Sequence, residues 1–352
     1  MKQLSTLPIL AFVTLGALWG FAFLAVNIGV TEGFNPVTFV FLRLTGSALI
    51  MVIILGFVIF MSPSYIKKPQ LSKDLLSKMF LMAFFNNTVP FVSVAIASTR
   101  VNVGVVSILN SGIPIFSAIF APLLIENEQL TRRRIMGIFT GFLGVIAVYL
   151  HALITDERDE VWLPGYFLVP LACASYGFAS VFGKKYLQKV PGALAVTLQL
   201  SSSCIQVFVF ASIYEAGIVG FFGYPALVLE QIRNASQPAI ISVFYVAIFA
   251  SCCAYGLYFY LLKTIGAVRQ TLVGYMLPFF GLLAGITVRN EWEDVSFLFK
   301  FLQVFGAFLI ISGVFVVQLE RRNPETNTTI NPLARVHNKE LLLVHDLEVN
   351  KK

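Results

Sequence analysis

The chain has 352 residues, of which 57% are hydrophobic and 12% are charged, and its mean hydropathy is +0.82. A soluble protein of this length could not bury so much apolar surface, so the composition excludes a water-soluble globule and predicts membrane spans. The formal net charge of +7 would allow nucleic-acid binding, but the placement of the basic residues along the chain argues against that class.

Ten mostly apolar stretches are each long enough to cross a hydrocarbon core of roughly 30 Å, which takes about 20 helical residues. In chain order they lie near residues 7–29, 36–61, 77–98, 102–125, 133–152, 164–187, 193–215, 239–262, 267–289 and 297–318. With the N-terminus in the cytoplasm, 19 basic residues fall on the cytoplasmic side and five on the other side. This bias satisfies the positive-inside rule and predicts that both termini are cytoplasmic. The segment 216–238 is then the longest outer loop.

The two halves of the chain repeat the same landmarks in the same order. The pairs are Trp19-Gly20 and Tyr176-Gly177, Pro114 and Pro278, Gly137 and Gly306, and Gly144 and Gly313. Because each half has five spans, an odd number, the second half must cross the membrane in the opposite sense. We therefore predict an all-α membrane protein of ten transmembrane helices, arranged as two inverted five-helix repeats, as in many secondary transporters. The repeats cover 7–152 and 164–318, joined by a loop at 153–163, and 319–352 form a polar cytoplasmic tail that we expect to be flexible.

The fourth and ninth spans each carry a face of small or polar residues with a proline. Asn110, Ser111 and Pro114 share one helical face of the fourth span, and Tyr275 and Pro278 lie at the matching places in the ninth. Such faces, loosened by proline, can line a shared aqueous path. The alternative is tight helix packing, which small and hydroxyl residues also favour in membranes. We favour the path because the pattern recurs in both halves.

Two further polar features lie inside the spans of the first half. In the third span Asn86 and Asn87 point about 100° apart, so only one of them can face a narrow site. We expect Asn87 to contact either the solute or another helix. In the second span, which begins at Asn35-Pro36 with cap and first-turn chemistry, Arg43 is the one charged residue well inside the membrane. A structural or gating role is favoured over direct binding of an anionic ligand group.

Several kinds of chemistry find no support in the sequence. No Asp or Glu lies near the middle of a span, and no His/Asp/Glu cluster or Ser/His pair lies within the bilayer. The four cysteines fall inside spans without a metal-binding spacing. We therefore predict no catalytic residues, no metal and no cofactor. A neutral or zwitterionic solute fits better than a phosphorylated one, which would require paired internal basic residues.

These features together resemble a known family, the EamA type of the drug/metabolite transporter superfamily, as two tandem EamA-like repeats. The resemblance is carried by Trp19-Gly20, Pro36, Arg43, Pro114, Gly137–Tyr149, Tyr176-Gly177, Pro278, Glu291 and Gly306–Gly313. It implies a ten-helix carrier that works by alternating access, with a central cavity lined mainly by helices 1, 3, 4, 6, 8 and 9. Helices 5 and 10 would pack at the periphery. The sequence departs from the family where Tyr176 replaces a frequent tryptophan and where the second repeat lacks a counterpart of Arg43.

The predicted function is a secondary transporter, not an enzyme, that moves a small polar or zwitterionic metabolite resembling an amino acid, a sugar or a drug. The substrate-pathway residues are Trp19, Asn87, Asn110, Ser111, Tyr176, Tyr255 and Tyr275, and the gating or structural residues are Arg43, Pro114 and Pro278. The alternatives are a membrane-embedded enzyme and a non-transporting receptor or scaffold. The expected partners are the lipid bilayer and a small-molecule solute, with no nucleic acid and with homodimerisation left open. A plasma membrane is favoured over an internal membrane.

Overall fold

The structure, a computed structural model, describes residues 6–62, 72–126, 131–154, 163–188, 190–215, 220–264, 271–293 and 295–318. The chain divides into two units, Met1–Val317 and Gln318–Lys352. Of the second unit, only Gln318 lies within the described residues. The predicted tail, 319–352, and most of the predicted connecting loop, 153–163, therefore lie outside them. The described part of the chain is all-helical and contains no strand.

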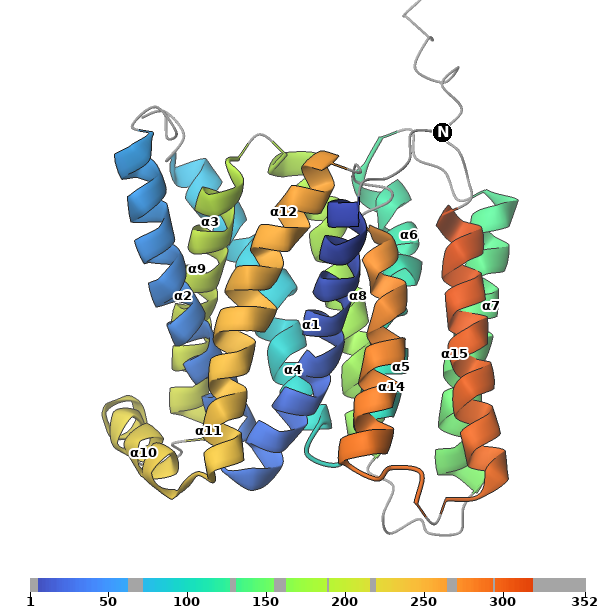
Figure 1. The fold of residues 1–352 in the computed structure, drawn as a ribbon. Helices are drawn as coiled ribbons and strands as arrows, with labels where there is room; N and C mark the ends of the chain where they lie inside the picture. The colour runs from blue at the N-terminus through green and yellow to red at the C-terminus, as the bar shows by residue number, and fades with distance from the viewer. Residues whose placement is uncertain are drawn as a thin grey trace, which may run out of the picture. The chain divides into compact units, whose positions relative to one another are not determined.

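Figure 1 shows the helices of the first unit running side by side. Those of the first half are α1 (Thr6–Glu32), α2 (Pro36–Met61), α3 (Lys73–Ala83), η3 (Phe84–Thr88), α4 (Val89–Ala97), α5 (Val103–Asn110), α6 (Ile113–Leu124) and α7 (Arg132–Ile154). Those of the second half are α8 (Leu163–Tyr186), α9 (Gly192–Tyr214), α10 (Gly220–Asn234), α11 (Gln237–Phe244), η5 (Tyr245–Cys253), α12 (Ala254–Thr264), η6 (Thr271–Tyr275), α14 (Met276–Val288) and α15 (Phe297–Gln318).

Eight helical segments of the described chain are long and apolar enough to cross a membrane. The two remaining predicted spans correspond to α7, which begins with three arginines, and to the shorter apolar helix at Val273–Val288. Their crossing of the bilayer, and hence the count of ten, stays a prediction. Large apolar side chains such as Phe57 and Phe60, 63% and 81% exposed, cover the outside of the helices. Such surfaces suit lipid rather than water, and the protein is a multi-pass membrane protein.

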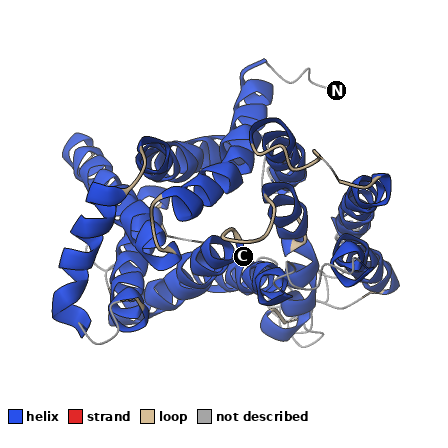
Figure 2. Ribbon diagram, turned by 90° about the horizontal axis from the view of Figure 1, so that it is seen from below, coloured by secondary structure: helices blue, strands red, loops and turns tan. Residues whose placement is uncertain are grey.

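The most extensive helix packing joins one half of the chain to the other. α2 packs against α9, α4 and α6 pack against α8, and α14 packs against both α1 and α5. The view along the helices shows them gathered around a common centre, with α7 and α15 paired at the right-hand edge (Figure 2). In that pair a Cβ built on Gly144 would lie 2.6 Å from the carbonyl oxygen of Gly306, so close contact between the two helices requires glycine.

Four spans depart from α-helical geometry near their middles, at corresponding places in the two halves. The third span contains the π-helix η3, and the eighth contains the π-helix η5. In the fourth span α5 ends before Ser111 and α6 begins at Ile113, while in the ninth the 3₁₀ helix η6 passes into α14 after Tyr275. The positions of these last two breaks are each three residues before a proline. Proline has no N–H and its ring clashes with the carbonyl four residues earlier, which favours an interruption of the helix at these places.

The predicted outer loop at 216–238 contains the helix α10 instead of an irregular segment. Its Tyr224 is fully buried, and the ring centre lies 5.7 Å from that of Phe41 and 5.6 Å from that of Phe208. The sequence did not indicate this helix within the predicted connection, because the contacts of Tyr224, which packs between α2 and α9, are tertiary.

Candidate functional site

The Arg43 side chain reaches from α2 to the second half of the chain. Its Nε donates a hydrogen bond to Ser251 Oγ in η5 at 3.4 Å, and its guanidinium carbon lies 3.8 Å from the centre of the Phe91 ring in α4. Tyr176 in α8 and Tyr255 in α12 are close enough to interact electrostatically with the guanidinium. Side chains from both halves therefore meet at one cation. These five residues are called the Arg43 cluster.

A row of side-chain amides and hydroxyls lies beside this cluster, between the third and seventh spans. Asn86 donates a hydrogen bond to Gln199 Oε1 at 3.0 Å and lies within interaction distance of the Tyr255 hydroxyl. Asn87 is fully buried, donates to Ser203 Oγ at 3.1 Å and accepts from Asn86 Nδ2 at 3.3 Å. Both adjacent amides are thus bonded to α9, and Asn86 in addition lies next to the cluster.

Trp19 connects α1 to the eighth span close to the same cluster. Its Nε1 donates a hydrogen bond to the carbonyl oxygen of Ala250 at 3.1 Å, and its ring centre lies 6.3 Å from that of Tyr258. The Tyr258 ring in turn lies 6.5 Å from that of Tyr255. A continuous series of aromatic contacts therefore runs from Trp19 to the Arg43 cluster.

The predicted residues of the fourth and ninth spans lie at the helix breaks. Asn110, 5% exposed, ends α5, and its Oδ1 is 4.0 Å from Cys173 Sγ in α8. The Ser111 hydroxyl donates to the Ile108 carbonyl oxygen at 2.6 Å. Tyr275 is the partly buried N-cap residue of α14. Pro114 lies in the first turn of α6, and Pro278 is buried in α14.

The structure thus brings three of the sequence-predicted residues, Arg43, Tyr176 and Tyr255, into one cluster, with Trp19 next to it. Sequence reasoning did not single out Phe91, Ser251 or Tyr258. A phenylalanine, a serine and a tyrosine in an apolar span carry no signal of their own, and only the position of Arg43 gives these three a role. Asn86 and Asn87 are adjacent amides in the sequence, and the structure places Asn86 next to Tyr255.

A second polar network joins the helix ends at the foot of Figure 1, where α1 ends at Glu32. Arg289 forms an ion pair with Glu32, with an N–O distance of 3.0 Å, and donates hydrogen bonds to Asn27 Oδ1 at 2.7 Å and Thr31 Oγ1 at 2.8 Å. Asn27 Nδ2 donates to the carbonyl oxygen of Ser98, just after α4, at 2.7 Å. These five residues, called the Glu32 network, tie the ends of the first, third and ninth spans together.

Two carboxylates of the second half cap helices of the first half at the same end. Glu215, which follows α9, accepts hydrogen bonds from the N–H groups of Val37 at 2.8 Å and Thr38 at 3.1 Å. Glu291, which follows α14, accepts from the two N–H groups at the start of α5. Asn35 was predicted to cap α2, but its side chain makes no cap hydrogen bond, because Glu215 occupies that role.

Burial raises the pKa of the Glu215 and Glu291 carboxyl groups above the ordinary value for glutamate, and the hydrogen bonds from the capped helices act in the opposite direction. Each acid therefore stabilises a helix N-terminus while losing part of its hydration.

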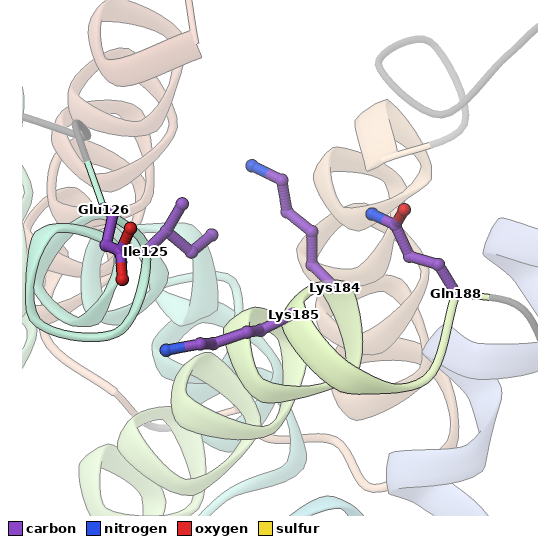
Figure 3. A pocket seen from close by; sticks show the side chains of 5 residues that line it. All are labelled: Ile125, Glu126, Lys184, Lys185 and Gln188. Atoms are coloured by element: carbon purple, nitrogen blue, oxygen red, sulfur yellow. The ribbon is translucent and has the colours of Figure 1, made fainter.

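At the opposite end of the helices, a shallow hollow of about 500 Å³ lies between the ends of α6 and α8. Figure 3 shows Ile125 and Glu126 on one side of it and Lys184, Lys185 and Gln188 on the other. The hollow is open and mixed in charge, and it is separate from the Arg43 cluster in the middle of the spans. It carries no arrangement of groups typical of catalysis.

A multi-pass helical fold with polar side chains from both halves meeting inside it is typical of membrane transporters. The chain belongs to the EamA-like transporter family, whose model matches residues 6–150 and 163–319.

Individual relatives are distant but similar over most of their length. The uncharacterized transporter YoaV of Bacillus subtilis is 21% identical over 309 residues, covering 87% of this chain and 95% of the relative. The probable amino-acid metabolite efflux pump of Escherichia coli is 22% identical over 302 residues, covering 85% and 90%. A solved structure titled "Crystal structure of protein" has a TM-score of 0.57 at 16% identity and covers 90% of this chain and 99% of its own, which supports the fold alone.

Proposed function

We propose that this chain is a secondary transporter that moves a small polar or zwitterionic metabolite across a membrane by alternating access, as an exporter, facilitator or exchanger. The observation that carries the proposal is the Arg43 cluster, where α2 and α4 of the first half meet α8, η5 and α12 of the second half. In secondary transporters of repeated architecture, the solute site lies near the bilayer midplane where the repeats meet.

Two features support alternating access as the mechanism. The non-α segments occur in the third and fourth spans and again in the eighth and ninth, so each half has hinge elements at matching depth. The Glu32 network joins one end of the helices through a partly exposed ion pair and a few hydrogen bonds, which are contacts that can be made and released at modest cost. We assign this end to the outer side, because the positive-inside rule places both termini in the cytoplasm.

The side chains near the cluster support the solute class. Asn86 offers an amide, Tyr176 and Tyr255 offer hydroxyl groups, and Trp19 with Tyr258 provides aromatic walls. Relatives in Escherichia coli and Salmonella typhimurium are named probable amino-acid metabolite efflux pumps, and we extend this solute class to the present chain.

The remaining predicted residues have supporting roles in this proposal. Asn110, Ser111 and Tyr275 form the discontinuous middle of the fourth and ninth spans, where Pro114 and Pro278 permit bending. Asn87 positions Asn86 through its hydrogen bonds to Asn86 and Ser203. We further propose that the chain acts in the plasma membrane and has no enzymatic activity, as its transporter family suggests.

The test is counterflow in liposomes that contain the purified full-length chain. Liposomes are preloaded with an unlabelled mixture of amino acids, sugars and nucleosides, and each labelled compound is then added outside. At least one compound should accumulate transiently above the level in protein-free liposomes. Asn110→Leu should lower this flux, whereas Phe57→Leu on the lipid-facing side of α2 should not.

Failure of every compound to accumulate would overturn the transport proposal. Flux of wild-type size in Asn110→Leu would remove the fourth span from the solute path. Turnover of a lipid by the purified protein, without solute flux, would favour the enzyme alternative.

A further inference from the structure

Arg43 is a charged group in the middle of the protein, and no residue of the described part of the chain gives it an acidic partner. Among the residues that the structure describes, none supplies it with a carboxylate: it contacts Ser251 and Phe91, and Tyr176 and Tyr255 are close enough to interact with it electrostatically. Transfer of an uncompensated guanidinium from water into a membrane protein is costly. A cation that is kept there without a counter-charge therefore needs another source of compensation.

The hydrogen-bonding capacity of Arg43 is also largely unused. A guanidinium has five N–H donors, and within the described part of the chain only Nε makes a hydrogen bond, at 3.4 Å. The Ser251 hydroxyl donates to the Val246 carbonyl oxygen at 2.8 Å, so it acts as the acceptor for Arg43. The two terminal nitrogens have no partner among the described residues, yet neither is fully buried. They retain surface that a water-sized group can reach.

The groups around these nitrogens suit an anion better than a second cation. Tyr176 and Tyr255 are close enough to the guanidinium to interact with it electrostatically. A tyrosine hydroxyl can donate a hydrogen bond to an anionic oxygen. Phe91 covers one face of the guanidinium at 3.8 Å, which leaves the edge of the fork for a ligand. A planar fork of two N–H groups matches the two oxygens of a carboxylate.

We propose that Arg43 binds the carboxylate of the transported solute, so that the solutes of this protein are monocarboxylates of the amino-acid type. This inference rests on the proposed transport function and names the chemistry of its site. One cation matches one carboxylate, whereas a phosphate monoester would bring a second negative charge that the described cluster does not balance. The aromatic series from Tyr255 through Tyr258 to Trp19 then contacts the rest of the solute.

The test compares matched acids and amides on the purified full-length protein. Each of the common amino acids is titrated beside its carboxamide, for example L-leucine beside L-leucinamide, and the melting temperature is recorded. At least one amino acid should stabilise the protein in proportion to the logarithm of its concentration. Its carboxamide should bind about 10- to 100-fold more weakly, since the charged hydrogen bonds to Arg43 are lost.

Variants of Arg43 then separate ligand binding from a structural role. Arg43→Gln should bind the amino acid about 10- to 100-fold more weakly and bind the carboxamide as the wild type does. Arg43→Lys, which keeps the charge but loses the fork, should fall between them. Arg289→Gln removes an arginine from the Glu32 network and should leave the preference for acid over amide intact.

Three results would overturn the proposal: no amino acid binds, carboxamides bind as tightly as acids, or Arg43→Gln keeps the preference of the wild type. If Arg43→Gln does not fold, Tyr255→Phe supplies the test, with a loss of about 3- to 10-fold confined to the acids. Counterflow keeps the two proposals apart. If a neutral solute is transported and Arg43→Gln transports it equally well, the proposal of transport is retained and the proposal that Arg43 binds a carboxylate is rejected.

Discussion

Arg43 and Arg289 are both partly buried arginines, but they have opposite surroundings. Arg289 lies at the helix ends with an ion pair to Glu32 and hydrogen bonds to Asn27 and Thr31. Arg43 lies inside the protein with one long hydrogen bond to Ser251 and a phenylalanine ring. The donors of Arg289 are used within the protein, whereas most donors of Arg43 have no partner among the described residues.

The difference in surroundings suits the two arginines to two tasks, which are holding helices together and binding an anion. A cation with its own counter-charge can hold two helices together, and the contact can be made and broken at modest cost where water is near. A cation without a counter-charge is unfavourable by itself and becomes favourable when an anion arrives. A solute that supplies this anion would stabilise a conformation in which the two halves enclose it.

The largest effect is expected when Arg43 is given an acidic partner, as Arg289 already has. Ser251→Asp places a carboxylate where the serine hydroxyl now accepts from Arg43 Nε. An internal ion pair would compete with the solute, and we expect initial flux in liposomes to fall about 10- to 100-fold. Ser251→Asn is the matched uncharged control and should retain most of the flux. Equal flux in Ser251→Asp and the wild type would contradict the unpaired state of Arg43.

The helix end containing Arg289 depends on acids for its structure, so removal of one should lower stability. Glu291→Ala leaves two N–H groups at the start of α5 without their acceptors. We expect a loss of about 1–2 kcal/mol, measured as a lower melting temperature of the detergent-purified protein. Glu291→Gln keeps one acceptor and should lose less. A larger loss in the Gln variant than in the Ala variant would argue against capping as the role of this side chain.

A weaker effect is expected from opening the Glu32 network. The side chains of Arg289 and Glu32 are 28% and 33% exposed, so their ion pair contributes at most about 1 kcal/mol. Glu32→Gln should therefore shift the closed–open equilibrium at this end by no more than about fivefold. The readout is the labelling rate of Ser98→Cys by a membrane-impermeant maleimide, in a background without the four native cysteines. Asp74→Asn, which removes the exposed ion pair with Lys78, should leave the rate unchanged.

The smallest expected effect is a pH dependence from the two capping acids. Burial raises the pKa of Glu215 and Glu291, so the folded state holds their protons more tightly than the unfolded state does. Their contribution to stability is therefore full below the ordinary glutamate pKa of about 4.3 and is lost as the pH rises through the raised pKa.

The check is the difference in melting temperature between the wild type and the double variant Glu215→Gln, Glu291→Gln. As the pH rises, the melting temperature of the wild type should fall relative to that of the double variant. If the melting temperature of the wild type instead rises relative to that of the double variant, the hydrogen bonds to the two carboxylates lower the pKa by more than desolvation raises it.

Much of the fold follows from local properties of the chain. Apolar stretches of membrane length predict the spans, and eight of them are long apolar helices in the described structure. Proline chemistry explains the breaks before Pro114 and Pro278, because the lost N–H and the steric clash are properties of the residue itself. The exceptional place of Arg43 is equally visible, since a charge in an apolar stretch stands out.

The partners of these residues are decided by the tertiary structure. Hydropathy cannot tell that Ser251 accepts from Arg43 or that Glu215 caps α2, because these contacts join residues 208 and 178 positions apart. Asn86 and Asn87 have the same side chain, and only the packing of α9 and α12 around them distinguishes their partners. The sequence alone therefore determined which segments enter the membrane and which side chains are costly there. The packing of one half against the other decided which of these side chains find partners among the described residues. The reason is that hydrogen bonds and ion pairs act over a few ångströms of space and not along the chain.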